Sequence, residues 1–137
     1  MKKFIRLDVK GEWRGTEHVS SVGVSSFVSG HEQFEGGVSC YKLDDQAEAL
    51  NDLRQYWFEI ASITEDDLEN MQITIFEGEL LDEWGSDGED LAICTKTLKE
   101  IDAKEIMIKV NELYWDMECG DITEEEYEEE LNKMELL

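Results

Sequence analysis

The sequence predicts an α+β fold: an antiparallel sheet, formed by an N-terminal three-stranded meander and a later hairpin, with an amphipathic helix and a C-terminal helical pair. Three observations predict it. Apolar and polar residues alternate near the N-terminus, apolar residues recur at helical spacing after residue 44, and an Asp-Gly turn separates two runs of β-formers. With 137 residues, 41% of them hydrophobic, we expect a single domain over 1–137 with one continuous core.

The near-neutral segment 1–43 predicts the three strands of the meander. FIRLDV at 4–9 alternates strictly between apolar and polar residues, as a half-buried strand does. The Ser- and Val-rich stretch at 18–30 has no helical period. GVSCYKL at 37–43 places β-formers between a glycine pair and an aspartate pair, which predicts the third strand.

Segment 44–100 predicts a helix followed by an acidic hairpin. Asp44 or Asp45 can cap a helix whose apolar side chains recur every three or four residues, and Thr64 followed by Asp67 predicts a short acidic helical turn. MQITIFEGELL and DLAICTKTL flank DEWGSDGE, so they predict the two strands of a hairpin. The apolar stripe of the helix consists of Ala47, Leu50, Leu53, Trp57 and Ile60.

Segment 101–137 predicts two acidic helices. Asp102 with Glu105 forms one capping-box pattern, and Thr123 with Glu126 forms a second. Gly120 between them is placed to end the first helix. Apolar residues fall on one face of each helix, so we predict that the acidic C-terminus is a packed helix and not a disordered tail. These residues are Ile106, Val110, Leu113 and Met117 in the first helix, and Tyr127, Leu131 and Met134 in the second.

The C-terminal segment GDITEEEYEEELNKMELL combines a glycine, an Ile-Thr-Glu-Glu-Glu run, an aromatic residue, a lysine and terminal leucines. In this pattern residues 108–137 resemble the SHOCT family of short C-terminal helical hairpins. The resemblance implies an interaction or oligomerisation module, with a dimer through the C-terminal helices as one option. The matching positions are Gly120, Ile122, Thr123, Glu124, Glu125, Glu126, Tyr127, Lys133, Leu136 and Leu137.

The charge is strongly negative and unevenly distributed. Residues 1–43 hold six bases and five acids, residues 44–100 hold three bases and 17 acids, and residues 101–137 hold three bases and 13 acids, for a net charge of −23. We therefore expect no direct binding to nucleic acid or to an anionic membrane, and a preference for basic protein surfaces. Solubility needs a net charge of only about 2 to 8, although a merely solvated acidic surface is the alternative explanation.

The acidic runs TEDDLEN, DEWGSDGED and TEEEYEEE account for much of this charge. The sequence resembles small anti-defence proteins of phages and mobile elements, including anti-CRISPR and anti-restriction inhibitors. The resemblance lies in these acidic runs, in the small size and in the absence of enzyme motifs. That resemblance implies a non-catalytic viral protein that mimics nucleic acid and blocks the nucleic-acid-binding surface of a bacterial defence nuclease; an interaction protein without mimicry is an alternative. The predicted partner-binding residues are Asp66, Asp67, Glu69, Asp82, Glu83, Trp84, Asp87, Glu89, Asp90, Glu124, Glu125, Glu128 and Glu129.

An enzymatic alternative rests on residue order. Arg14, Ser25 and Glu79 occur in the order of the arginine–serine–glutamate signature and are similar in this to ADP-ribosyltransferases. The resemblance implies that the arginine and serine hold the dinucleotide, while the glutamate orients the acceptor.

No cofactor or metal is expected from the sequence. His18 and His31 have no second ligand at metal-binding spacing, and DEWGSDGED lacks the alternating ligands of an EF-hand loop. The three cysteines, Cys40, Cys94 and Cys119, form no CxxC pair, and the N-terminus lacks the continuous apolar run of a signal peptide. A reducing, cytoplasmic setting is the corresponding expectation.

Overall fold

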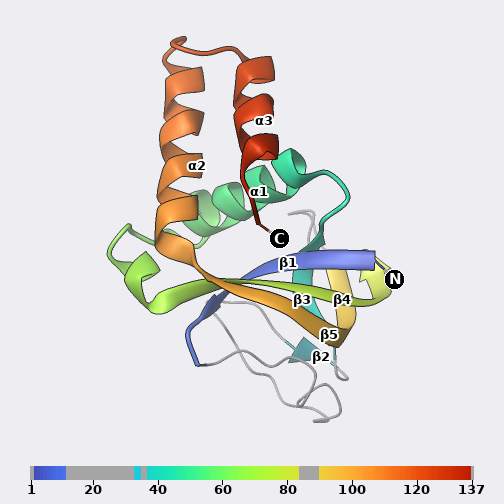
Figure 1. Ribbon diagram of the computed structural model, residues 1–137. Coiled ribbons are helices and arrows are strands. Elements are labelled where there is room, and N and C mark those ends of the chain that lie inside the picture. The colour runs from blue at the N-terminus through green and yellow to red at the C-terminus, as the bar shows by residue number, and fades with distance from the viewer. Residues whose placement is uncertain (1, 12–32, 35–36, 84–89, 137) are drawn as a thin grey trace.

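The computed structural model describes residues 2–11, 33–34, 37–83 and 90–136, with backbone alone for residues 33, 34, 37, 82 and 83. The fold is mixed α+β, as predicted, and its C-terminal helices are present (Figure 1). The described elements are β1 (Lys2–Val9), β2 (Gln33–Phe34), β3 (Gly37–Lys42), α1 (Gln46–Arg54), a π-helical turn η1 (Gln55–Ile60), a 3-10 turn η2 (Asp67–Asn70), β4 (Met71–Glu83), β5 (Asp90–Asp102), α2 (Ala103–Glu118) and α3 (Glu124–Lys133).

The antiparallel sheet closes on itself. Its strand order is β1-β4-β5-β3-β2, and β1 also pairs with β3 through Phe4↔Lys42 and Ile5↔Tyr41. This direct contact differs from the predicted meander, in which a middle strand would separate the first and third strands. The predicted middle strand at 18–30 lies outside the described residues. The later hairpin is confirmed as β4 and β5.

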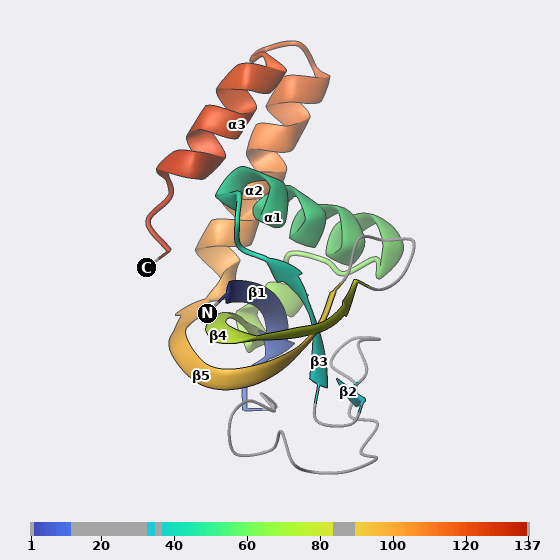
Figure 2. The same ribbon diagram turned by 90° about the vertical axis from the view of Figure 1, so that its right-hand side faces the viewer.

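The two long hairpin strands bend strongly (Figure 2). Their register shifts at three places, between Ile75 and Phe76, between Glu77 and Gly78, and between Leu80 and Asp82. Such irregularities bend a strand and increase its twist. At Gly78 the strands approach so closely that a Cβ atom would lie 2.2 Å from the Ile93 carbonyl oxygen. The bulges and this glycine let β4 and β5 curve until the sheet can close.

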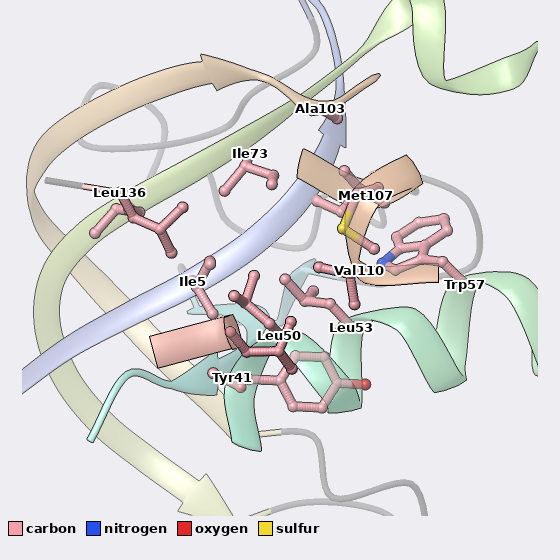
Figure 3. Packing of buried hydrophobic residues seen from close by; sticks show 14 of the residues in the cluster. Ile5, Tyr41, Leu50, Leu53, Trp57, Ile73, Ala103, Met107, Val110 and Leu136 are labelled. Atoms are coloured by element: carbon pink, nitrogen blue, oxygen red, sulfur yellow. The ribbon is translucent and has the colours of Figure 1, made fainter. Parts of the chain in front are cut away.

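The main core lies between the sheet and the helices (Figure 3). Ile5 and Leu7 of β1 point into it, and Trp57 is buried in the same cluster. The alternate side chains of β1 point to the opposite side, where Phe4 stacks on Phe76 in a second, smaller cluster. Both sides of the sheet are thus buried, because successive strand residues face opposite ways.

The helices form a layer on one side of the sheet. Figure 1 shows α1 lying across the sheet while α2 and α3 stand together beyond it. α3 is packed through Tyr127 and Leu131, which are buried. The prediction of a C-terminal helix in place of an acidic tail is therefore confirmed.

The apolar stripe of the first helix departs from prediction at its end. α1 begins at one of the two predicted caps, Asp45, whose carboxylate accepts the Glu48 N–H at 3.3 Å. The following turn is π-helical, with i→i+5 bonding, and this shifts the phase of the side chains. Trp57 stays buried, whereas Ile60 is 51% exposed. The predicted burial of Ile60 is therefore wrong.

Only one of the two predicted capping boxes forms. Thr123 and Glu126 bond each other's backbone N–H groups, both at 3.1 Å. α2 also begins where predicted, but Asp102 makes no capping bond and instead pairs with Lys10 at 2.6 Å. Gly120 has φ +83°, the left-handed conformation expected after a helix end.

Candidate partner-binding surface

α3 is fixed to α1 by polar contacts that join the start of one helix to the end of the other. The Gln46 amide donates to the carbonyl oxygens of Leu131 and Met134 at 2.8 and 2.6 Å. In return, the Ala47 N–H donates to the Asn132 side-chain oxygen at 3.0 Å. Groups that helix ends leave unsatisfied are thus paired between the two helices. This pairing holds the acidic face of α3 in a fixed position relative to α1.

A groove of about 310 Å³ lies among α1, α2 and α3. Carboxylates line it from two sides, and tyrosines and a methionine contribute apolar surface. No basic side chain is among the lining residues. They are Asp45, Ala47, Glu48 and Asn51 on the α1 side, Tyr114 and Met117 on α2, and Glu124, Tyr127 and Glu128 on α3.

The two tyrosines of the groove are held in place by Asn51 and Arg54. The Tyr127 hydroxyl donates to the Asn51 side-chain oxygen at 2.8 Å, and burial raises the pKa of Tyr127 to about 12. The buried Arg54 guanidinium stacks on Tyr114, 3.4 Å from the ring centroid, and bonds Glu59 and Asn111. Both tyrosines therefore remain protonated and fixed at neutral pH, and the groove combines rigid aromatic rings with carboxylates.

The outer face of α3 continues this acidic surface. Glu124, Glu125, Glu128 and Glu129 are all exposed, as predicted for partner-binding residues. Within the described part of the chain, Lys133 lies 3.5 Å from Glu130, and no base lies within ion-pair distance of the other four glutamates. Neighbours four positions apart on a helix are about 5–6 Å apart. The face is thus a closely spaced array of carboxylates.

The predicted residues of η2 form a separate acidic group. Asp66, Asp67 and Glu69 are exposed, but two of them already have contacts: the Asp67 carboxylate accepts from Thr64, and Glu69 pairs with Lys104 at 2.8 Å. Lys104 lies in the first turn of α2, whereas α3 follows the other end of that helix. A 16-residue helix is about 24 Å long. The predicted single face is therefore divided between the two ends of α2.

One predicted partner-binding residue is wrong. Asp90 is only 6% exposed, and its carboxylate accepts the Lys42 N–H at 3.1 Å. Its carboxylate is thus engaged in the fold where β5 begins, which does not fit a surface role. Of the other hairpin residues, Asp82 and Glu83 belong to β4, whereas Trp84, Asp87 and Glu89 lie outside the described residues.

Sequence reasoning missed the α1 and α2 sides of the groove. It considered Asp45 only as a helix cap and Tyr127 only as part of an apolar stripe, and it did not single out Glu48 or Tyr114. The signal was present in part, since Tyr127 lies on the same helix as the predicted Glu124 and Glu128. The position of α1 beside α3 is a tertiary contact, and nothing in the local sequence encodes it.

The chemical alternatives gain no geometric support. Glu79 is exposed on β4, and Arg14, Ser25, His18 and His31 lie outside the described residues, so the transferase alternative stays a prediction. Among described residues there is no group of three or more His, Cys, Asp or Glu side chains arranged to hold a metal ion.

No family model matches this chain, and neither the curated proteins nor the solved structures gave a match. None of the helices in the described ranges is long and apolar enough to cross a membrane.

Proposed function

We propose that this protein is a non-catalytic binding protein that presents its helical layer to a basic surface of another protein. The observation that carries the proposal is the groove among the three helices, where four carboxylates, Asp45, Glu48, Glu124 and Glu128, surround two tyrosines. No basic side chain lines the groove, and the buried Arg54 covers one face of Tyr114 from behind it. Aromatic rings beside carboxylates suit the guanidinium and ammonium groups of a partner, which gain both ion pairing and cation–π contact.

The rigidity of this surface supports a binding role. The contacts from Gln46 and Asn132 hold α3 against α1 before any partner arrives. A preorganised surface loses little conformational entropy on binding. Like-charged neighbours on α3 also repel each other, at about 0.2–0.5 kcal/mol per pair. A merely solvated helix would gain from interspersed lysines, so the uniform sign favours a partner of opposite charge.

The basic partner that we propose is a nucleic-acid-binding enzyme, and specifically a bacterial defence nuclease. The support is the repeated carboxylate spacing on α3, comparable to that of successive phosphates along a strand, together with the resemblance to anti-defence proteins. In this proposal the glutamates occupy the channel that otherwise holds nucleic acid, and the protein inhibits by exclusion.

The test compares two variants that remove the same number of charges. One replaces Glu124, Glu125, Glu128 and Glu129 with glutamine; the matched control replaces four exposed glutamates outside the predicted partner-binding set, Glu79, Glu100, Glu105 and Glu112, with glutamine. Proteins captured from a bacterial lysate at low salt are eluted with duplex DNA, with RNA or with salt. We expect basic nucleic-acid-binding proteins that nucleic acid displaces, and at least about tenfold weaker capture by the α3 variant only, since rigid interfacial charges contribute more than rim charges.

Two outcomes would contradict the proposal. Equal loss of capture in both variants would mean that net charge alone attracts the partner. A partner that holds nucleic acid and this protein together would exclude mimicry. Binding should also weaken with salt, because the Debye length falls from about 10 Å at 0.1 M to about 3 Å at 1 M.

A further inference from the structure

A second, mainly apolar pocket opens on the surface where the helix α1 ends. Its volume is about 570 Å³, within the range of ligand-binding pockets, and it lies between the turns η1 and η2 and the ends of β1 and β4. Six of its eight lining residues have apolar or aromatic side chains. The lining consists of Val9, Tyr56, Ile60, Ala61, Ile63, Asp67, Asn70 and Met71.

The walls of the pocket are built from unusual but well-bonded backbone. The π-helical turn ends with the Ala61 N–H donating to the Tyr56 carbonyl oxygen at 2.8 Å. Ser62 then has φ +56°, which a residue with a side chain rarely adopts. On the far wall, the Lys10 N–H donates to the Asn70 carbonyl oxygen at 2.8 Å. π-turns and left-handed residues both concentrate at functional sites, and here they occur together at one pocket.

The π-turn has a direct consequence for this pocket. It turns Ile60 away from the core to which the α-helical period would assign it, and leaves its side chain 51% exposed at the pocket wall. An exposed isoleucine beside an open apolar pocket is costly in water unless a partner covers both. Scattered exposed apolar residues are ordinary, whereas an apolar surface rimmed by polar residues is typical of an interaction site, and Ile60 extends the apolar lining of this pocket.

The rim of the pocket is negatively charged. Glu65, Asp66 and Asp67 are exposed in the segment that forms one wall. Two bases lie close to this segment: Lys10 pairs with Asp102, and Lys104 pairs with Glu69 and also interacts electrostatically with Asp66 and Glu65. The rim therefore carries an excess of carboxylates around an apolar interior.

We propose that this pocket receives an apolar side chain, such as leucine, from a partner segment that carries lysine or arginine on both sides of it. The inference rests on the proposed function, since the acidic rim would attract the same basic partner. It adds that one apolar side chain of that partner lies in this pocket. The apolar side chain supplies contact area, and the flanking bases meet Glu65, Asp66 and Asp67. In protein interfaces a buried anchor side chain within a polar rim carries most of the affinity.

The probes are two synthetic peptides of equal charge, Lys-Lys-Leu-Lys-Lys and Lys-Lys-Ser-Lys-Lys, with both ends blocked. Titration calorimetry gives their affinities, and methyl NMR locates them. We expect the Leu peptide to bind at least about fivefold tighter, because burial of one leucine side chain is worth several-fold in affinity. Its methyl shifts should concentrate at Val9, Ile63 and Met71.

Two variants distinguish the pocket from the rest of the surface. Ile60→Ser removes exposed apolar surface at the pocket and should reduce the advantage of the Leu peptide to about twofold or less. Leu81→Ser, which alters a residue on β4 that is 46% exposed, is the matched control and should leave the advantage unchanged. Unfolding curves of both variants establish that each is folded.

The outcomes separate this inference from the proposed function. Equal affinity for the two peptides, with binding that salt abolishes, overturns the pocket and leaves the acidic surface standing. No binding of either peptide at low salt overturns both. Concentration-dependent self-association that Ile60→Ser abolishes also overturns the inference, because the pocket then belongs to a second copy of the chain.

Discussion

The carboxylates of the sheet and those of α3 differ in what surrounds them. Asp8 on β1 is fully buried, where it is paired with Arg6 and accepts the Thr74 hydroxyl at 2.7 Å. Burial raises the pKa of Asp8, and the nearby Arg6 charge opposes that rise. Glu124, Glu125, Glu128 and Glu129 of α3 are exposed, and none of these four has a base within ion-pair distance among the described residues.

This difference separates structural acids from available acids. A buried carboxylate must be paired and hydrogen-bonded, because an uncompensated charge in the interior strongly destabilises the folded state. An exposed row of like charges contributes nothing comparable to stability and repels itself. In the sheet, Asp8 is thus part of the fold's internal pairing, whereas Glu128 and Glu129 of α3, beyond the first turn, make no ion pair among the described residues. Four predictions examine this division, beginning with the largest effect.

Truncation after Gly120 removes the exposed glutamates of α3 together with the helix that carries them. Tyr127, Leu131 and Leu136 are at most 3% exposed, and burying each is worth about 1.5–3 kcal/mol. The free energy of unfolding should fall by more than about 4 kcal/mol, a large share of the stability of a small domain. Thermal melting followed by circular dichroism measures this. Unchanged melting, with fast amide exchange through residues 124–135, would mean that the segment is a tail after all.

Asp8→Ala breaks the buried pair within the sheet. The substitution leaves Arg6 charged in the interior, and loss of one partner of such a pair costs about 3–5 kcal/mol. Glu129→Ala on α3 is the matched control, with an expected change within about 0.5 kcal/mol. Urea unfolding of both variants gives the comparison. Similar destabilisation by the two substitutions would remove the distinction between structural and available acids.

The two helix starts provide a finer comparison. Thr123→Ala removes a cap that bonds the Glu126 N–H, so we expect a loss of about 1 kcal/mol. Asp102→Ala removes a residue that makes no capping bond and only an exposed pair with Lys10, worth at most about 1 kcal/mol and commonly less. Chemical unfolding should therefore rank Thr123→Ala as the more damaging. The reverse ranking would mean that Asp102 caps α2 in solution.

The starts of α2 and α3 also illustrate which features the sequence could predict. Local patterns predicted the helix starts, the Thr123 cap, a cap at Asp44 or Asp45, and the hairpin, because each depends on neighbouring residues. They did not give the closed sheet, since strand order depends on contacts distant in sequence. The same limit explains the errors in the site. Asp102 forms an ion pair with Lys10, which lies 92 positions earlier in the chain, and not a capping bond with α2. Asp90 is buried because β5 pairs with β3 at this position.

The smallest expected effect concerns Asp52, whose carboxyl group is influenced both by an acid of the groove and by an acid of the sheet. Its pKa is raised from 3.8 to about 6, chiefly by burial, then by Glu48 of the groove and by Asp90 of the sheet. Because its pKa is raised in the folded state, that state binds the proton more tightly than the unfolded chain does. The cost of the ionised carboxylate is thus fully present above about pH 6 and absent below about pH 4. This group alone makes stability fall as pH rises through that window.

Asp52→Asn tests the point directly. The variant should be more stable than the original chain at pH 7, and the difference should vanish as the pH approaches 4. Because the carboxyl is only partly buried, solvent screening keeps the gain below about 1 kcal/mol. Asp121→Asn, in the exposed connection between α2 and α3, controls for the loss of one negative charge. Urea unfolding at pH 7, 6, 5 and 4 measures both variants, and an equal gain from both at pH 7 would assign the effect to net charge and not to the position of Asp52 between sheet and groove.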